Sequence, residues 1–364
     1  MNVRDVAAAL ETLAPPHLAA EWDNTGLLLG DRAAPVRRVM LCIDLTGEVL
    51  DEAAAARAEM VMAYHPLIFK PISRVTAQEH AVAWRAARTG LAVYCPHTAL
   101  DVAAGGTNDA LAAVMGLQGP QPLEPQDSAA NSKIVVFVHP ENLDAVSRAA
   151  FAAGAGRIGS YSECSFHGSG MGTFRGAAGT SPAVGKSGRL EEVHELRLEV
   201  LAPRGAAGEI VSAIRAAHSY EEPAIDIYPL DPLPDGQGMG RVGDLPRAMT
   251  ALGLIARIKK AISLAAVQVA GPRRQRVVRA ACCAGSCGTI WRAALSAGAN
   301  FYLTGEMHHH DALAAAAANM TVVCVGHSNS ERPVLPLLRK NLLKLLPALK
   351  VTISRRDKDP FTQM

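Results

Sequence analysis

Aromatic residues are scarce in this 364-residue chain, at 4%, and charged residues make up 19% against 49% hydrophobic residues. The core must therefore be built largely from alanine and aliphatic side chains. A disordered or low-complexity protein is excluded, because such chains lack the apolar residues that a core needs. The length predicts two domains, since a typical domain has about 150 residues.

A charge excess of one sign and long apolar runs are missing as well. The 36 basic and 34 acidic residues give a net charge of +2, so nucleic acid is disfavoured as a partner. Charges such as Arg257 and Lys259 interrupt the most apolar segments, which argues against a membrane span or a membrane partner. Arg4 and Glu11 stand where a signal peptide needs an unbroken apolar stretch. We therefore expect a cytoplasmic protein.

The seven cysteines form no CxxC pair, so neither a zinc ribbon nor a thioredoxin-type dithiol is indicated. Cys42 and Cys324 lie within apolar runs, where a buried free thiol is the ordinary interpretation. We expect the clustered Cys282, Cys283 and Cys287 to be structural.

The order of predicted elements changes twice along the chain. Residues 1–118 begin with a predicted helix at 3–13 and then alternate strands and helices with short connections, which predicts a parallel sheet. The same alternation resumes near residue 276. Residues 119–131 and 231–246 contain several prolines and are expected to be linkers.

The segment between these linkers follows a different plan. Its strands and helices come in a βα…βαβ order, which is consistent with a ferredoxin-like α+β domain. The fold prediction is therefore an α/β domain with a parallel-rich sheet, formed by residues 1–128 and 233–364. An inserted α+β domain of residues 132–230 interrupts it.

Polar side chains of the ligand type follow nearly every predicted strand of the α/β domain. Ligands bind beyond the carboxyl ends of strands in open parallel sheets. The residues at or just beyond these ends are Asp44, His65, His97, Asp101, Glu306, His327 and Glu331. One histidine alone would more often be structural, but this concentration favours a metal site. Imidazole and carboxylate ligands without thiolate suit Zn, Mn, Fe, Co or Ni.

The segment GHSNSERP (326–333) adds detail to this prediction. We expect His327 at a strand exit, Ser330 as the cap of the next helix and Glu331 in its first turn. A carboxylate at that turn can bridge two ions, and free N–H groups of the helix would face an incoming anion.

Several longer motifs lie on both sides of the central segment. They are EWDNTGLLLG (21–30), YHPLIF (64–69), HTALDVAAGGTNDALA (97–112), YLTGEMHHHDAL (302–313) and GHSNSERP (326–333). Together they resemble the Nif-three-like dinuclear metal-centre proteins, also labelled GTP cyclohydrolase type-two homologues. The central segment, with HSYEEPAIDIYPL (218–230), is similar to the PII-like (PII/CutA-like) insert of the longer members of that family.

This resemblance implies two divalent cations per subunit and a homohexameric toroid. The residues that fall on the family's ligand positions are His65, Asp101, His327 and Glu331, with Glu331 on the bridging position and His97 beside them. Many members have histidine where this chain has Tyr64. A phenol with a pKa of about 10 must lose its proton to bind a metal well, so a single ion per subunit is the alternative.

Two divalent ions would carry more positive charge than the carboxylates of Asp101 and Glu331 neutralise, so the site would have a net positive charge. Such a site should attract hydroxide and an anionic small molecule such as a phosphate. We therefore expect a metal-dependent, GTP cyclohydrolase-like hydrolase in which a metal-bound hydroxide attacks a nucleotide-like or phosphorylated small molecule. Glu306 and His97 are the candidate catalytic proton carriers. The alternative is a non-catalytic metal-binding or regulatory protein whose PII-like insert senses a ligand.

Four weaker signals have competing interpretations. AGSCG (284–288) is one residue short of the serine-hydrolase motif, and a turn whose N–H groups approach an anion fits better. His308–His310 open a predicted helix, with His310 as the candidate for the wall of the site. Trp22 is either at the mouth of the site or a buried structural residue. In the insert, His218, Glu221 and Glu222 are either a metal site or surface residues.

Overall fold

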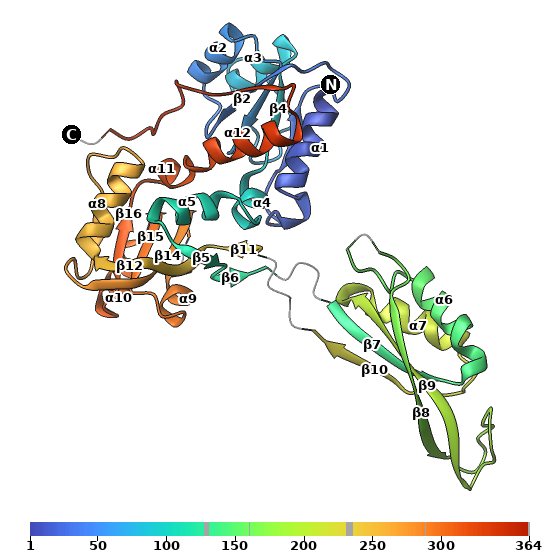
Figure 1. The fold of residues 1–364 in the computed structure, drawn as a ribbon. Coiled ribbons are helices and arrows are strands. Elements are labelled where there is room, and N and C mark those ends of the chain that lie inside the picture. The colour runs from blue at the N-terminus through green and yellow to red at the C-terminus, as the bar shows by residue number, and fades with distance from the viewer. Residues whose placement is uncertain (127–130, 160, 231–235, 288, 363–364) are drawn as a thin grey trace. The chain divides into compact units, whose positions relative to one another are not determined.

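A computed structural model describes residues 1–126, 131–159, 161–230, 236–287 and 289–362 of the chain. The chain divides into two compact units (Figure 1). Met1–Gln126 and Pro234–Met364 form one of them, here called the main unit, and Asp127–Leu233 form the other, the inserted unit. The boundaries predicted at residues 128 and 233 lie outside the described residues.

The first sheet of the main unit has five strands in the order β1-β4-β3-β2-β17. Four of them are parallel and only the edge strand β1 runs antiparallel. The strands are β1 (Gly26–Leu29), β2 (Arg38–Cys42), β3 (Met60–Ala63), β4 (Ala92–Cys95) and β17 (Lys350–Ile353). β3 and β4 are buried along their whole length, as strands covered by helices on both faces must be.

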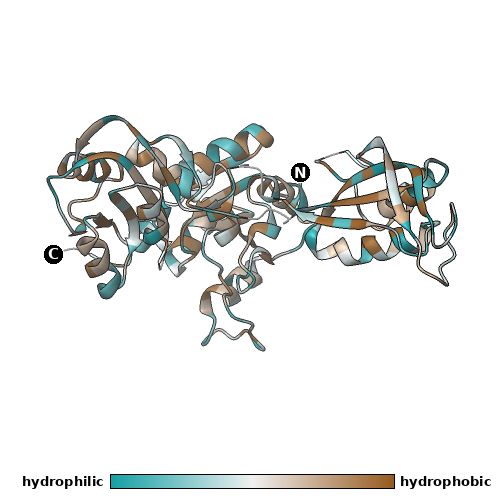
Figure 2. Cartoon of the chain, turned by 90° about the horizontal axis from the view of Figure 1, so that it is seen from below, coloured by the Kyte–Doolittle hydropathy of each residue, from teal (hydrophilic) through white to brown (hydrophobic). Residues whose placement is uncertain are grey.

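Helices cover both faces of this sheet. The predicted helix at 3–13 is confirmed as α1 (Val3–Leu13), which an Asn2 capping box begins. α1 and α12 (Val334–Leu345) pack on the face that carries Val39. α2 (Gly47–Ala55) and α3 (Ala81–Thr89) lie over the other face. The helices carry both hydrophobic and hydrophilic residues (Figure 2), and the buried residues of these four helices belong to the cores on the two faces of the sheet.

The second sheet of the main unit has six strands in the order β13-β16-β15-β14-β12-β5. The pairings of β14 with β15 and of β15 with β16 are parallel, and the other three pairings are antiparallel. The strands are β5 (Gln118–Gln121), β12 (Arg241–Thr250), β13 (Gln268–Ala270), β14 (Arg276–Ser286), β15 (Phe301–Glu306) and β16 (Thr321–Cys324). One face of this sheet is covered by α5 (Thr107–Met115) and α8 (Ala251–Ala261). The other face is covered by α9 (Trp291–Ser296) and α10 (His309–Ala317).

The predicted parallel-rich sheet is therefore confirmed in part: four strands of the first sheet run parallel, but the strands of the main unit are divided between two mixed sheets. The two expected linkers are also wrong in part. Residues 119–131 contain β6 (Glu124–Pro125) and most of β5, and residues 231–246 contain β11 (Gly238–Met239) and the start of β12. β6 and β11 pair with each other. Proline and glycine suggested linkers there, but short edge strands tolerate both residues.

A buried arginine fixes the chain where it returns to the main unit. The guanidinium of Arg241 donates to both carboxylate oxygens of Asp109, at 2.8 and 2.7 Å, and to the carbonyls of Gly238 and Gly240. A buried arginine needs this degree of pairing, because an unpartnered buried charge is costly. It thereby joins β12 to α5 of the N-terminal segment.

The inserted unit is a single antiparallel sheet with two helices. Its elements are β7 (Asn131–Val138), α6 (Leu143–Ala152), β8 (Ser165–Arg175), β9 (Leu190–Pro203), α7 (Ala207–Ala217) and β10 (Ile225–Pro229). The strand order is β10-β7-β9-β8, and every pairing is antiparallel. α6 and α7 lie on one face (Figure 1) and form its core with β7 and β9.

The remaining helical elements are short. They are α4 (His97–Val102), α11 (His327–Glu331) and three 3₁₀ turns at Pro16–Leu18, Pro140–Asn142 and Arg204–Ala206. Among all the helices that the structure describes, none has both the length and the apolar character needed to span a bilayer.

Candidate metal centre

Two histidines and one glutamate from distant parts of the main unit meet where strands of both sheets end. His65 follows β3 of the first sheet, and Pro66 directly after it cannot extend the strand ladder. His327 begins α11, which follows β16 of the second sheet, and Glu331 ends the same short helix. The carboxyl ends of the parallel strands thus bring the three side chains together.

Glu331 lies between the two imidazoles. Its Oε1 is 3.1 Å from Nε2 of His327, and its Oε2 is 3.4 Å from Nε2 of His65. The two ring centroids are 5.4 Å apart. Each of the three residues offers a ligand atom, and all three atoms lie within 4.8 Å of one another.

A carboxylate contacts Nδ1 of each histidine, on the side of the ring opposite Glu331. Asp44, just past β2, lies 2.9 Å from Nδ1 of His65, and Glu306, the last residue of β15, lies 2.9 Å from Nδ1 of His327. A carboxylate on Nδ1 fixes the ring orientation and directs Nε2 toward Glu331, which is the common arrangement behind metal-binding histidines.

The electrostatics of the group follow from this chain of alternating charges. Burial lowers the pKa of His65, but hydrogen bonds and charges from Asp44 and Glu331 outweigh it and raise the pKa to about 10. Glu331 and Glu306 raise the pKa of His327 to about 9, against the effect of burial. Burial opposes ionisation of Glu331, yet the two histidines hold its pKa below the usual value. Without a bound cation, His65 and His327 are therefore both protonated at neutral pH, and their positive charges compensate the negative charge of Glu331.

These residues fit a divalent cation. Glu331 is only 3% exposed, and among the described residues its Oε2 atom has no hydrogen-bond donor in good geometry. A buried carboxylate oxygen without such a donor is costly, and a cation between it and the two Nε2 atoms would satisfy it. The donors, two imidazoles and a carboxylate, suit Zn and the other metals expected from the sequence.

The fourth expected ligand, Asp101, is not part of this group. Its buried carboxylate accepts a hydrogen bond from the hydroxyl of Tyr64, whose ring is 5.1 Å from that of His65. Burial raises the pKa of Asp101 to about 7. Burial and the charges of Asp101 and Glu331 also raise the pKa of Tyr64 well above 10, so the phenol stays protonated in the metal-free protein.

His97 lies beside the group, with its ring centroid 5.3 Å from that of His65. Its Nδ1 is 2.7 Å from Oδ1 of Asp23. The backbone of His97 has a φ of 28°, a conformation that residues other than glycine rarely adopt. Such strained residues are frequent at functional sites. Asp23 belongs to the EWDN motif, which was expected near the mouth of the site, but its pairing with His97 was not predicted.

Two exposed aromatic rings stand next to His97. Trp22 is 64% exposed and Phe69 is 48% exposed. Their centroids are 5.9 Å apart, and both lie within 6.5 Å of the centroid of His97. Trp22 is therefore not the buried structural residue that one interpretation of its motif suggested.

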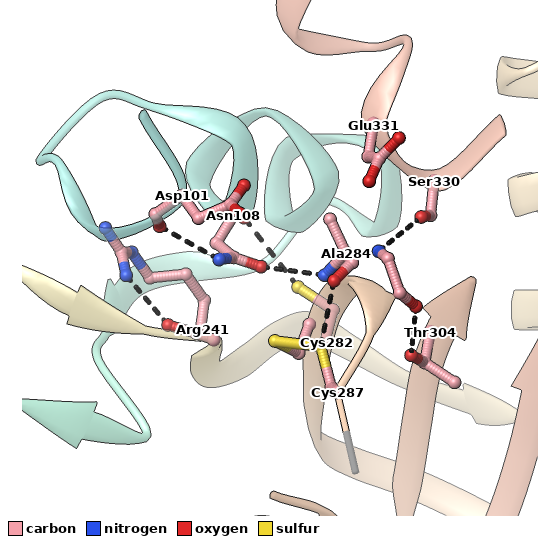
Figure 3. The surroundings of a disulfide bond; sticks show 12 residues. Asp101, Asn108, Arg241, Cys282, Ala284, Cys287, Thr304, Ser330 and Glu331 are labelled. Atoms are coloured by element: carbon pink, nitrogen blue, oxygen red, sulfur yellow. Dashed lines mark hydrogen bonds between the residues drawn. A yellow bond between two sulfur atoms is a disulfide. The ribbon is translucent and has the colours of Figure 1, made fainter. Parts of the chain in front are cut away.

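The end of β14 forms a turn against Glu331 (Figure 3). The N–H of Gly285 donates to Oγ of Ser330 at 2.8 Å, and the N–H of Ala284 donates to Oδ1 of Asn108 at 2.9 Å. A side chain on Gly285, whose φ is 72°, would come within 3.0 Å of Oε1 of Glu331. The expectation that this turn offers N–H groups to an anion is thus wrong for these two residues, because both groups are already used.

Two further expectations about this region change. A disulfide joins Cys283 to Cys287 below the turn, which the spacing of the cysteines did not suggest. Ser330 does not cap the following helix, because it belongs to α11 and its hydroxyl donates to the carbonyl of His327. The last residue of the AGSCG segment, Gly288, lies outside the described residues.

The remaining histidine candidates do not join the group. His308, His309 and His310 are exposed at the start of α10. In the inserted unit, both ring nitrogens of His218 have partners, the carbonyl of Phe137 and the N–H of Tyr220. Among the described residues, His65, His327 and Glu331 are the one group with metal-binding geometry.

Comparisons with known proteins agree with this description. The family model described as Duf34/NIF3 (NGG1p interacting factor 3) matches residues 1–360. A "GTP cyclohydrolase 1 type 2 homolog" of Halalkalibacterium halodurans is 36% identical over 99% of this chain and 98% of its own length. A protein of Mycobacterium tuberculosis with the same name is 38% identical over 97% of this chain and 96% of its own. The crystal structure of a Bacillus cereus protein related to NIF3 has a TM-score of 0.72, is 34% identical, and covers 100% of this chain and 99% of its own.

Proposed function

The chain belongs to the Duf34/NIF3 family, and from this premise we propose that it is a divalent-metal-dependent hydrolase of nucleotide-like or phosphorylated small molecules. The buried Glu331 carboxylate between two imidazole nitrogens is the observation that carries the proposal. The names of the curated relatives point to the same chemistry, since ring opening of GTP is a hydrolysis.

His65, His327 and Glu331 would hold the first ion. A bound divalent cation lowers the pKa of a coordinated water toward neutrality and stabilises negative charge that develops on the substrate. Asp44 and Glu306 keep the two imidazoles oriented and draw the Nδ1 protons toward themselves, which increases the basicity of Nε2.

Proton transfer falls to two residues at the edge of the group. Glu306 is on the exposed side of His327, where its carboxylate can exchange a proton with solvent. Asp23 engages Nδ1 of His97, which leaves Nε2 of His97 as the atom that can take or give a proton. We therefore propose Glu306 and His97 as the general acid and base, in agreement with their places beside the ligands.

Substrate contacts follow from charge and shape. Asp44, Glu306 and Glu331 make the metal-free site acidic, so an anionic substrate would bind only after cations do. Trp22 and Phe69 offer exposed ring faces near His97, and aromatic side chains stack well on planar heterocycles. A phosphorylated molecule with a planar base would use both features.

We also propose a second, weaker ion near Tyr64 and Asp101. Asp101 and Glu331 would supply carboxylates to it, as the family resemblance implies. The high pKa of Tyr64 makes the phenol a poor ligand, so occupancy by one ion is the expected state at low metal concentration.

The assembly and the insert complete the proposal. The order β10-β7-β9-β8 with two helices on one face supports a ferredoxin-like domain of the PII/CutA type. We propose a homohexamer on the family resemblance, and light scattering should then give about six times the chain mass of 38.2 kDa.

Metal analysis followed by an activity panel tests the function. Purified protein should retain a divalent metal and hydrolyse at least one member of a panel of nucleotides, including GTP, and phosphoesters. A chelator should abolish turnover, and re-added metal should restore it. His65→Ala should lose metal and activity together, whereas His309→Ala, which removes an exposed histidine outside the group, should retain both.

Two outcomes separate the alternatives. If Trp22→Ala raises KM with little change in kcat, this ring has a role in substrate binding. Bound metal without turnover on any substrate would overturn the hydrolase and favour the non-catalytic metal-binding or regulatory protein.

A further inference from the structure

The inserted unit contains a cavity of about 430 Å³ that shares no residue with the metal centre. It lies at the end of β8, against β9 and the segment that leads into β10. Its walls include Phe137, Phe174, Val184 and Tyr220. Small-molecule sites are typically cavities of roughly 300 to 1,000 Å³ with mostly apolar walls and a few polar groups, and this cavity has both properties.

Hydrogen bonds hold the cavity wall in place. The segment after β8 folds back, and the N–H of Gly188 donates to the carbonyl of Gly176 at 2.8 Å. The N–H of Ser181 then donates to Oε2 of Glu221 at 3.0 Å, which ties this segment to the opposite wall. The wall is therefore formed without a ligand.

The charge of the lining selects the ligand. Three of its residues are glutamates, and lysine and arginine are absent from it. Glu221 already accepts the N–H of Ser181, and Glu222 lies 3.4 Å from Arg215 outside the cavity. Glu195 is the third carboxylate, and its charge acts on another cavity residue, Tyr220, whose buried hydroxyl has no hydrogen-bond partner among the described residues.

Glycine makes room for the Glu195 carboxylate inside the cavity. A Cβ at Gly172 would lie 2.0 Å from Oε2 of Glu195, so the carboxylate occupies the space that a side chain on β8 would fill. Burial and Glu195 raise the pKa of Tyr220 to about 12, so its hydroxyl stays protonated. A carboxylate beside aromatic rings attracts a cation in two ways, by charge and by the ring faces.

We propose that this cavity binds a small organic amine, with its protonated amino group on Glu195 and its apolar or aromatic body between Phe174, Val184 and Tyr220. The carboxylate of Glu195 disfavours phosphorylated and carboxylated molecules, which would place a second negative charge beside it. The chemistry is opposite to that of the metal centre, so the cavity is a second site and not an extension of the first.

A pair of probes with the same apolar body and terminal groups of opposite charge tests the proposal. Tryptamine and indole-3-propionate carry the same indole and a chain of the same length, ending in an ammonium or a carboxylate. Calorimetric titration of the full chain should show tryptamine binding at least about tenfold more tightly than indole-3-propionate. Glu195→Gln should weaken tryptamine binding by about tenfold, while Glu192→Gln, on the same strand but outside the cavity, should not.

Ala183→Trp is a second variant that fills the cavity without touching the carboxylate, and it should abolish binding of both probes. Circular dichroism melting of each variant verifies folding. Equal affinity for the two probes, no binding of tryptamine at about 1 mM, or equal effects of Glu195→Gln and Glu192→Gln would each overturn the proposal.

Discussion

The carboxylate of Glu331 lies 3.1 Å from Nε2 of His327, one helical turn earlier on α11. The same carboxylate reaches His65, which comes from the other sheet of the main unit, at 3.4 Å. One buried glutamate therefore links the carboxyl ends of strands from two sheets. A charge in that position is costly unless it is neutralised, and protons or a metal ion can do this.

Glu331→Gln should remove the negative charge and leave the shape of the side chain nearly unchanged. Loss of a residue that only hydrogen-bonds to a metal ligand typically lowers metal affinity by about 10- to 100-fold. Because Glu331 is itself a proposed ligand, we expect a larger fall in metal affinity. Metal analysis after dialysis against a graded chelator series measures this. Retention of wild-type metal content by a folded Glu331→Gln variant would contradict the assignment of Glu331 as a ligand.

The metal-free protein should lose stability as the pH rises. The pKa values of His65 and His327 are raised in the fold to about 10 and about 9, from 6.5. A raised pKa means that the folded state binds the proton more tightly, so this stabilisation is complete below pH about 6.5 and is lost as the pH passes through about 9 to 10. Because metal binds neutral imidazole, metal should stabilise more strongly at high pH than at low pH.

Melting temperatures between pH 6 and 10, with chelator and with excess metal, test this directly. Glu331→Gln removes a negative charge that raises the pKa of both histidines, and it should flatten the slope in chelator. A melting temperature that does not change with pH in the chelated wild-type protein would contradict the prediction.

The carboxylates behind the histidines should matter less than Glu331, but measurably. Asp44→Asn and Glu306→Gln each retain an oxygen near Nδ1 but lose its charge. We expect metal affinity to drop by about 10- to 100-fold in each. Glu48→Gln, an exposed change in the first turn of α2, is the matched control, and an equal effect in all three variants would show that charge at a distance is responsible.

The main features of this centre follow from the sequence. Parallel strands place their carboxyl ends along one edge, so His65, His327 and Glu331 were identifiable as ligand-type residues just past strands. The two sheets were not predictable, because antiparallel edge strands such as β1 and β13 are set by packing between distant segments. The pairing of Asp23 with His97, 74 residues away, depends on the same packing.

Two features near the site lacked any usable signal in the sequence. Tyr64 was recognisable as an unusual ligand, but not as the partner of Asp101, because that contact depends on side-chain rotamers in a buried space. The disulfide joins cysteines four residues apart, and only the turn at Gly285 brings Cys283 and Cys287 together. Spacing rules for metal and redox motifs do not cover such a turn.

Tyr64→His should increase the amount of metal that the chain binds. Imidazole has a pKa of about 6.5 and phenol about 10, so histidine binds without the cost of removing a proton at neutral pH. We expect the affinity for a second ion to rise at least about tenfold, measured by calorimetric titration of stripped protein. Tyr64→Phe removes the hydroxyl without adding a ligand and is the control; unchanged stoichiometry in Tyr64→His would contradict a second ion near Asp101.

Reduction of the Cys283–Cys287 disulfide should destabilise the main unit. The bond closes a loop of a few residues and restricts the unfolded chain, which by the chain-entropy relation corresponds to about 2 kcal/mol. The double variant Cys283→Ser and Cys287→Ser should show the same loss without reductant. Urea unfolding with and without dithiothreitol measures both. Cys324→Ser, which changes a free cysteine on β16 of the same sheet, should remain sensitive to dithiothreitol. If the double variant were as sensitive to the reductant as the wild type, the bond between these two residues would not be the cause.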